Sequence, residues 1–165
     1  MSHPMTIHAR PARPSADELR TRALGPEAFF EHVEYETARH ARYLGGVAIV
    51  RLAPRHGRRG TEALQDAVET ELRRTDVACR YPDGSHVVLL GQVDRRAAES
   101  IAQRLVEVAA EIDLGHGAPA AEFVIGVGAS QGRRITAAEL WAAADDELAV
   151  ERGENESRAV TLLNA

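Results

Sequence analysis

The sequence contains no lysine, so all 20 of its basic residues are arginine, and it has one cysteine. A lone Cys79 excludes an internal disulfide, and because it alternates with Val77 and Tyr81 in a β-rich run, we expect a buried structural thiol. No apolar run is long enough to span a bilayer, which argues against membrane insertion. The N-terminus lacks the apolar core of a signal peptide, so we expect a cytoplasmic protein.

The charge balance is acidic, with a formal net charge of −5 over 165 residues. An acidic chain argues against general nucleic-acid binding, although local arginine clusters could hold a small anion. The length suits one domain with a real core plus a short tail. Residues 1–15 show no hydrophobic periodicity and are predicted to be a disordered tail, which leaves 16–165 as the domain.

Hydrophobic spacing then alternates between helical and strand periods along the domain. It predicts helices at 17–24, 26–44, 61–73, 94–112 and 136–152, and strands at 47–52, 76–81, 86–91, 121–128 and 158–163. Thr61, Asp94 and Thr136 are the predicted N-caps, since their side chains can accept hydrogen bonds from free backbone N–H groups. Helices and strands in this order predict a mixed α/β domain.

The two strands at 76–81 and 86–91 flank a turn of sequence Pro-Asp-Gly-Ser. Pro82 presets φ for the first corner of a type I turn, and Gly84 can adopt the left-handed conformation that closes it. The segment is therefore predicted to be a β-hairpin.

One helix face could bind a metal. His32, Glu36 and His40 recur every four residues and so share one side of the helix predicted at 26–44. The alternative is a solvated face rich in Glu and His, and we favour it, so no metal is expected here.

The hairpin and its surroundings resemble those of GGDEF (diguanylate cyclase) domains. Leu72, Arg73, Asp76 and Arg80 match the run that leads into the family signature, and 87–90 match the strand that follows it. The signature itself reads Pro82, Asp83, Gly84, Ser85 and His86 in this chain. The last helix resembles the family's ending through Glu139, Leu140, Ala144, Asp145 and Leu148. The resemblance implies an α/β (α+β) sandwich of the nucleotidyl-cyclase type, with a five-stranded, mostly antiparallel sheet surrounded by helices.

The same resemblance implies a lost catalytic site. Active members hold two Mg²⁺ with an aspartate after the first strand and an acidic residue of the signature. Here the strand offers Arg51 and Ala53, and the signature offers Gly84 and Ser85. The loop at 54–60 also lacks the family's longer nucleotide-recognition segment. We therefore expect a degenerate domain that is not an enzyme and uses no cofactor.

A second site known in the family, an inhibitory R-x-x-D motif for cyclic di-GMP, keeps its spacing. It comprises Arg73 and Asp76, five residues ahead of the signature, with Arg104 as the expected third member. Arginine can fork onto guanine or phosphate, and aspartate can accept from guanine. Alternatively, Arg73 caps a helix and Asp76 only starts a strand.

Two functions follow from these alternatives. The first is a cyclic di-GMP receptor in signal transduction that acts through at least one protein partner. The second is a nucleotide-independent interaction or scaffold domain that kept only the fold. A homodimer is compatible with both.

Overall fold

The structure, a computed structural model, describes residues 24–43, 45–113 and 119–153. The predicted tail at 1–15, most of the helix predicted at 17–24 and the strand predicted at 158–163 lie outside the described residues. The elements along the chain are α2 (Pro26–Tyr43), β1 (Val47–Pro54), α3 (Thr61–Glu71), β2 (Val77–Arg80), β3 (His86–Gly91), α4 (Arg95–Ile112), β4 (Phe123–Ala129) and α5 (Ala137–Glu151). No helix in these ranges is long and apolar enough to cross a membrane.

The described strands form one sheet in the order β2-β3-β1-β4, and every neighbouring pair is antiparallel. Val50 in the central strand lies opposite Val88 on one side and Val127 on the other. The α+β class and the antiparallel sheet predicted from the sequence are confirmed. The predicted fifth strand falls outside the described ranges, so the described sheet has four.

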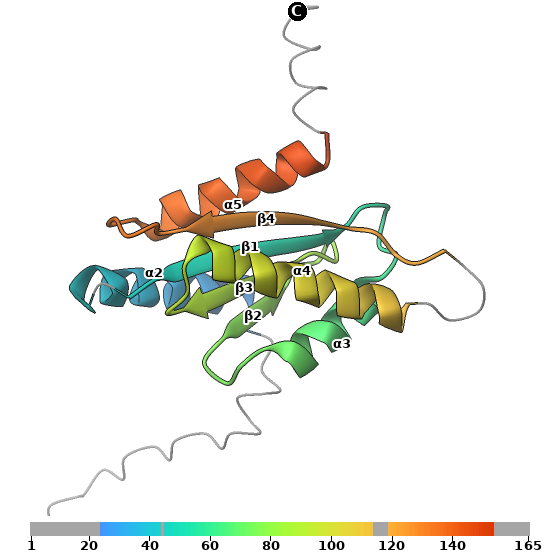
Figure 1. Cartoon of the computed structure of the whole chain (residues 1–165), viewed down its shortest axis with the longest axis horizontal. Helices are drawn as coiled ribbons and strands as arrows, with labels where there is room; N and C mark the ends of the chain where they lie inside the picture. Colours follow the sequence, from blue (N-terminus) through green and yellow to red (C-terminus); the bar gives the residue numbers. More distant parts are fainter. Residues whose placement is uncertain (1–23, 44, 114–118, 154–165) are drawn as a thin grey trace, which may run out of the picture.

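Helices cover both faces of the sheet (Figure 1). Ala48, Val50 and Leu52 of β1 join one core with α3 and α4. Val47 and Ile49, which alternate with them, join a second core with α2 and α5. Because side chains alternate across a strand, burial on both faces gives β1 its continuous apolar run instead of an alternating pattern.

The α5 helix lies directly on the backbone of β4 (Figure 1). A Cβ atom on Gly126 would stand 2.0 Å from the Ala144 carbonyl oxygen, and one on Gly128 would stand 2.1 Å from that of Leu140. Neither contact is tolerable, so glycine is required at both positions. Leu140 over Gly128 and Ala144 over Gly126 also show that α5 runs antiparallel to β4.

Two of the three predicted N-caps are confirmed. The Asp94 side chain accepts a hydrogen bond from Ala97 N at 2.7 Å, and Thr136 forms a reciprocal capping box with Glu139. The Thr61 prediction is wrong: Gly60 is the N-cap of α3, and Thr61 is its first helical residue. Gly60 has a φ of 84°, a left-handed conformation that Thr disfavours.

Candidate functional site

The predicted R-x-x-D motif forms a closed turn between α3 and β2. The backbone N–H of Arg73 donates to Asp76 Oδ2 at 3.0 Å, and the N–H of Asp76 donates to the Arg73 carbonyl at the same distance. α3 ends at Glu71 rather than at the predicted Arg73, because Leu72 is already extended. The Arg73 side chain is exposed, so the turn presents a guanidinium to solvent while its backbone is fixed by the aspartate.

Arg104 reaches the same end of α3 from the neighbouring helix. Its Nη2 atom lies 2.7 Å from Glu71 Oε2, and α3 and α4 pack against each other. Glu71 precedes Arg73 by two residues, so the ion pair brings Arg104 to the region of the turn. The Arg104 side chain is 71% exposed and the Glu71 side chain 23%. No hydrogen bond joins Arg104 to Arg73 or Asp76 among the described residues.

The surroundings of Asp76 in the turn disfavour the charged form of its carboxylate. Burial raises the pKa of Asp76, and the hydrogen bond and charge of Arg73 offset only part of that rise. An aspartate whose charge is poorly solvated gains from an additional hydrogen-bond donor. The arrangement can therefore present two guanidinium groups and one carboxylate to a ligand that carries both acceptors and donors.

The hairpin carries the second predicted site, the altered signature. Gly84 N donates to the Tyr81 carbonyl at 3.0 Å, and Tyr81 N donates to the Ser85 carbonyl at 2.8 Å. Gly84 has a φ of 87°, as the left-handed closing position requires. The predicted hairpin is thus confirmed. Gly84 also presses against α3, where an added Cβ atom would stand 2.6 Å from Thr61 Oγ1.

Asp83 is the one carboxylate of this turn, and it is already used. Its Oδ1 atom accepts from Ser85 N at 2.9 Å and from Ser85 Oγ at 2.6 Å. Burial raises the pKa of Asp83, but the two hydrogen bonds from Ser85 and the charges of Arg152 and Arg51 together bring the pKa below its ordinary value. No group of three His, Cys, Asp or Glu residues suited to a metal occurs within the described ranges.

An arginine lies where the family places its metal-binding aspartate. Arg51, at the centre of β1, forms an ion pair with Asp145 of α5. Its guanidinium carbon lies 5.4 Å from the centre of the Trp141 ring and 5.9 Å from that of Tyr81. The side chain is only 12% exposed. A nearly buried cation between two rings cannot share this position with Mg²⁺, so the residues present do not fit the two-metal site.

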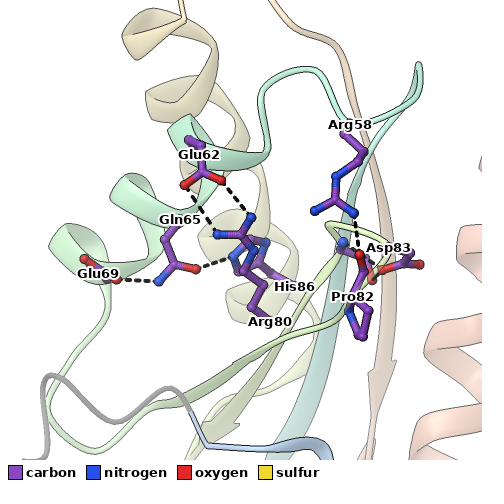
Figure 2. A network of polar contacts seen from close by, with 9 residues as sticks. Arg58, Glu62, Gln65, Glu69, Arg80, Pro82, Asp83 and His86 are labelled. Carbon is purple, nitrogen blue, oxygen red and sulfur yellow. Dashed lines mark hydrogen bonds and ion pairs between the residues drawn. The ribbon is translucent and has the colours of Figure 1, made fainter.

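Beside the hairpin, a chain of polar contacts links α3 to β2 and β3 (Figure 2). Arg80 binds Glu62 through two hydrogen bonds of 3.3 and 2.7 Å. His86 Nε2 lies 2.7 Å from Gln65 Oε1, and the Gln65 amide nitrogen donates to Glu69. Because the carboxylate of Glu69 can only accept, Gln65 turns its oxygen to His86, which must then be protonated on Nε2.

His86 is buried, with 1% of its surface exposed. Burial, and after it the positive charge of Arg80, lower its pKa from 6.5 to about 4. The buried ring is polar but neutral near pH 7, and its Nε2 is hydrogen-bonded to Gln65.

The basic loop that follows β1 is held down on several sides. Arg55 contacts Glu122 at 3.4 Å and Glu151 at 3.7 Å, and Arg58 donates to the Pro82 carbonyl of the hairpin. Arg58 thus joins the loop to the hairpin, and the charge of Arg55 is matched by two glutamates.

The three residues of the alternative metal face do not converge. His32 is exposed and its ring contacts Tyr35, whereas His40 is buried with Nε2 3.4 Å from the Arg133 carbonyl. Glu36 interacts with Arg39.

Sequence reasoning missed Glu71 and Trp141, which complete the surroundings of Arg104 and Arg51. Charge could have pointed to Glu71, because an acidic residue in the last turn of a helix is poorly placed for the helix dipole and gains from a nearby arginine. No feature of the sequence indicated that Trp141 would contact Arg51.

The comparisons with known proteins bear on the fold. No protein-family model and no curated protein sequence matches this chain. The search of solved structures finds the diguanylate cyclase SiaD from Pseudomonas aeruginosa, in complex with its activator SiaC, with a TM-score of 0.68 and 17% identity over 82% of this chain. The match spans only 57% of the SiaD chain.

Two further matches are isolated or nearly isolated domains. The GGDEF domain of YfiN (TpbB) from Pseudomonas aeruginosa matches with a TM-score of 0.68 and 16% identity, over 82% of this chain and 87% of its own. The coiled coil and GGDEF domain of DgcB from Caulobacter crescentus, in complex with c-di-GMP, matches with a TM-score of 0.69 and 12% identity, over 81% and 79%. At these identities the likeness concerns the fold: this chain has the fold of GGDEF domains.

Proposed function

We propose that this chain is a catalytically inactive GGDEF-like domain that binds cyclic di-GMP through Arg73, Asp76 and Arg104 and regulates a protein partner. The observation that carries the proposal is the convergence at the end of α3. Arg73 and Asp76 form one hydrogen-bonded turn, and Arg104 of the neighbouring helix pairs with Glu71, two residues before that turn.

The chemistry of this surface suits a cyclic dinucleotide. Guanidinium groups can bind guanine O6 and N7 or a phosphate, and the carboxylate can accept from the guanine N1–H and amino groups. Both arginine side chains are exposed, so a ligand could reach them without rearrangement of the core. The DgcB structure, which contains c-di-GMP, is a case of this fold together with that ligand.

The ligand set at the expected metal site supports the proposed inactivity. Mg²⁺ requires oxygen donors in near-octahedral geometry. Arg51 and Ala53 in β1, with Gly84 and Ser85 in the hairpin, supply no carboxylate, and Asp83 is engaged by Ser85. Without the two metals, the charge that develops during phosphoryl transfer has no counterpart.

Isothermal titration of the protein with cyclic di-GMP tests the binding site. We expect micromolar binding that is lost in Arg73→Ala and in Asp76→Asn, the latter chosen because asparagine can still accept the hydrogen bond that closes the turn. Arg74→Ala is the matched control, since it removes a neighbouring exposed arginine of the same turn. An absence of heat from a folded protein at high ligand concentration would refute the receptor function.

The second candidate, a nucleotide-independent scaffold, is favoured by a different observation. Arg104 and Asp76 already have internal partners, in Glu71 and in the backbone of Arg73. Under this alternative the turn and the ion pair only join α3 to its neighbours. Titration that gives no heat, together with a loss of stability of up to about 1 kcal/mol in Glu71→Gln, would support the scaffold.

A further inference from the structure

The outer face of α2 exposes two tyrosines. The helix packs into the molecule through its opposite face, where the buried residues are Phe29, Val33, Thr37 and His40. On the outer face, Tyr35 is 64% and Tyr43 70% exposed. Tyrosine is enriched where proteins meet, because its ring gains from burial while its hydroxyl can stay hydrated.

Tyr35 lies at the centre of a regular stripe on this face. The stripe consists of exposed residues at alternating spacings of three and four: Ala28, Glu31, Tyr35, Ala38 and Arg42. At 3.6 residues per turn, all of them lie within roughly 60° of Tyr35 around the helix axis. Residues at this spacing form the seam along which two helices pack side by side. The alanines are small, so a second helix can approach closely on both sides of Tyr35.

The charges of α2 are separated into an acidic first half and a basic second half. Glu27 and Glu31 are four residues apart and therefore repel each other on the helix surface. Neither has an ion pair within the described ranges. Arg39 and Arg42, three residues apart, repel each other in the same way, and of these two only Arg39 has a partner there, Glu36. An opposite charge from outside the helix would relieve the repulsion in either half.

We propose that two copies of this chain associate through the outer faces of their α2 helices, which run antiparallel with Tyr35 near the two-fold axis. The antiparallel arrangement sets the acidic half of each helix against the basic half of the other. A parallel arrangement would bring like charges together. The face is therefore self-complementary, as a two-fold interface requires. This proposal is independent of the proposed function, because α2 covers the face of the sheet opposite to α3 and α4.

The two-fold symmetry determines which residues meet. Ala28 and Arg42 each lie seven residues from Tyr35, so Ala28 of one copy faces Arg42 of the other. The small alanine leaves room for the guanidinium. Glu31, on the next turn of the helix, offers it a carboxylate. The interface thus has a central pair of tyrosines between two symmetric Glu31–Arg42 pairs.

The small size of this interface sets its strength. One pair of helices buries less surface than the roughly 1,200 Å² at which specific, stable interfaces begin. We therefore expect a weak dimer, with a dissociation constant on the order of 100 μM. Its affinity should fall as salt is added, because the ion pairs lie near solvent.

Sedimentation equilibrium of the full-length protein, at low ionic strength and without nucleotide, tests the proposal. We expect a dimer whose dissociation constant rises by about tenfold or more in Glu31→Arg and in Arg42→Glu, since each substitution opposes like charges at both symmetric pairs. An equimolar mixture of the two variants should form the dimer again. In the mixed dimer, both pairs once more join opposite charges.

The matched controls are Asp66→Arg and Arg96→Glu, which reverse the same charges at exposed positions of α3 and α4. Neither should alter the dimer. Circular dichroism should show that all variants are folded. Glu31→Arg even replaces a repulsive neighbour of Glu27 with an attractive one, which favours the helix.

Three results would overturn the proposal. The first is a protein that remains monomeric at concentrations up to about 1 mM, well above the expected dissociation constant. The second is a dimer that both charge reversals leave intact, which would assign association to another surface. The third is a mixture of the two variants that stays monomeric, which would exclude the antiparallel pairing.

Discussion

His86 Nε2 and Gln65 Oε1 lie 2.7 Å apart and connect the hairpin to α3. The pair is buried on the histidine side, so its energetics depend on the charge of the imidazole. A protonated ring could still donate to Gln65, but burial, and after it the nearby guanidinium of Arg80, disfavour its charge. The surroundings of His86 therefore favour the neutral form.

This pair predicts a loss of stability in acid. The pKa of His86 is lowered from 6.5 to about 4 in the folded protein, so the unfolded chain binds the extra proton first. The stabilisation is complete above pH 6.5 and is lost as the pH falls toward 4, by roughly 2–3 kcal/mol. Urea unfolding of the protein and of His86→Gln across this range should show a steeper decline for the unmodified chain. Parallel curves would contradict the prediction.

Substituting alanine for Gly84 should destabilise the protein more than substituting alanine for Gly132, although both glycines are left-handed. Gly84→Ala places a Cβ atom against Thr61 and also requires a left-handed alanine, so we expect a loss of about 2–4 kcal/mol. Gly132→Ala is the matched control, with a φ of 72° and open space around the new atom. It should cost only about 1–2 kcal/mol. Chemical denaturation of both variants gives the comparison, and equal losses would show that Thr61 yields freely.

Glu71 predicts a gain of affinity, provided that the proposed receptor function holds. Glu71→Gln removes the carboxylate that competes with an anionic ligand for Arg104. Exposed ion pairs contribute about 0.2–1 kcal/mol, so cyclic di-GMP binding should tighten by up to about fivefold. Glu62→Gln, on the same helix but paired with Arg80, should leave the affinity unchanged. Weaker binding in Glu71→Gln would mean that Glu71 positions Arg104 for the ligand.

Arg51 predicts a spectroscopic change, because Trp141 is the single tryptophan of the chain. Arg51→Met keeps most of the side-chain volume but removes the cation above the Trp141 ring and the ion pair with Asp145. We expect altered tryptophan fluorescence and a loss of about 1–2 kcal/mol in the free energy of unfolding. Arg55→Met, an arginine of the neighbouring loop, should leave the fluorescence unchanged. An unaltered spectrum in Arg51→Met would refute the stacking.

Sequence reasoning predicted most of the fold because its signals are local. Apolar periodicity located the helices and strands of the described ranges, and the side chains of Asp94 and Thr136 marked two helix starts. The same reasoning placed the N-cap of α3 at Thr61. The actual N-cap, the left-handed Gly60, has no side chain that could mark it as a cap in the sequence. The turn at Pro82 was predictable for the opposite reason, since proline and glycine restrict the backbone in characteristic ways.

The site was less predictable because its contacts join distant parts of the chain. The spacing of Arg73 and Asp76 suggested a shared turn, and the structure shows them hydrogen-bonded to each other. The pairing of Arg104 with Glu71 depends on how two helices pack, and the position of Arg51 beside Trp141 depends on how α5 packs on β1. No local pattern encodes such packing, so these partners emerge only in three dimensions.

The glycines of β4 have a mechanical consequence. At Gly126 and Gly128 the backbone of α5 rests on the backbone of β4, so at these two points no side chain separates the elements. Shear motions consist of small sliding movements of packed elements over their side chains. The α3–α4 layer has such side chains, and it also carries Glu71 and Arg104. A displacement at that end of the molecule would therefore shift α3 and α4, while α5 and β4 would move together as a rigid unit.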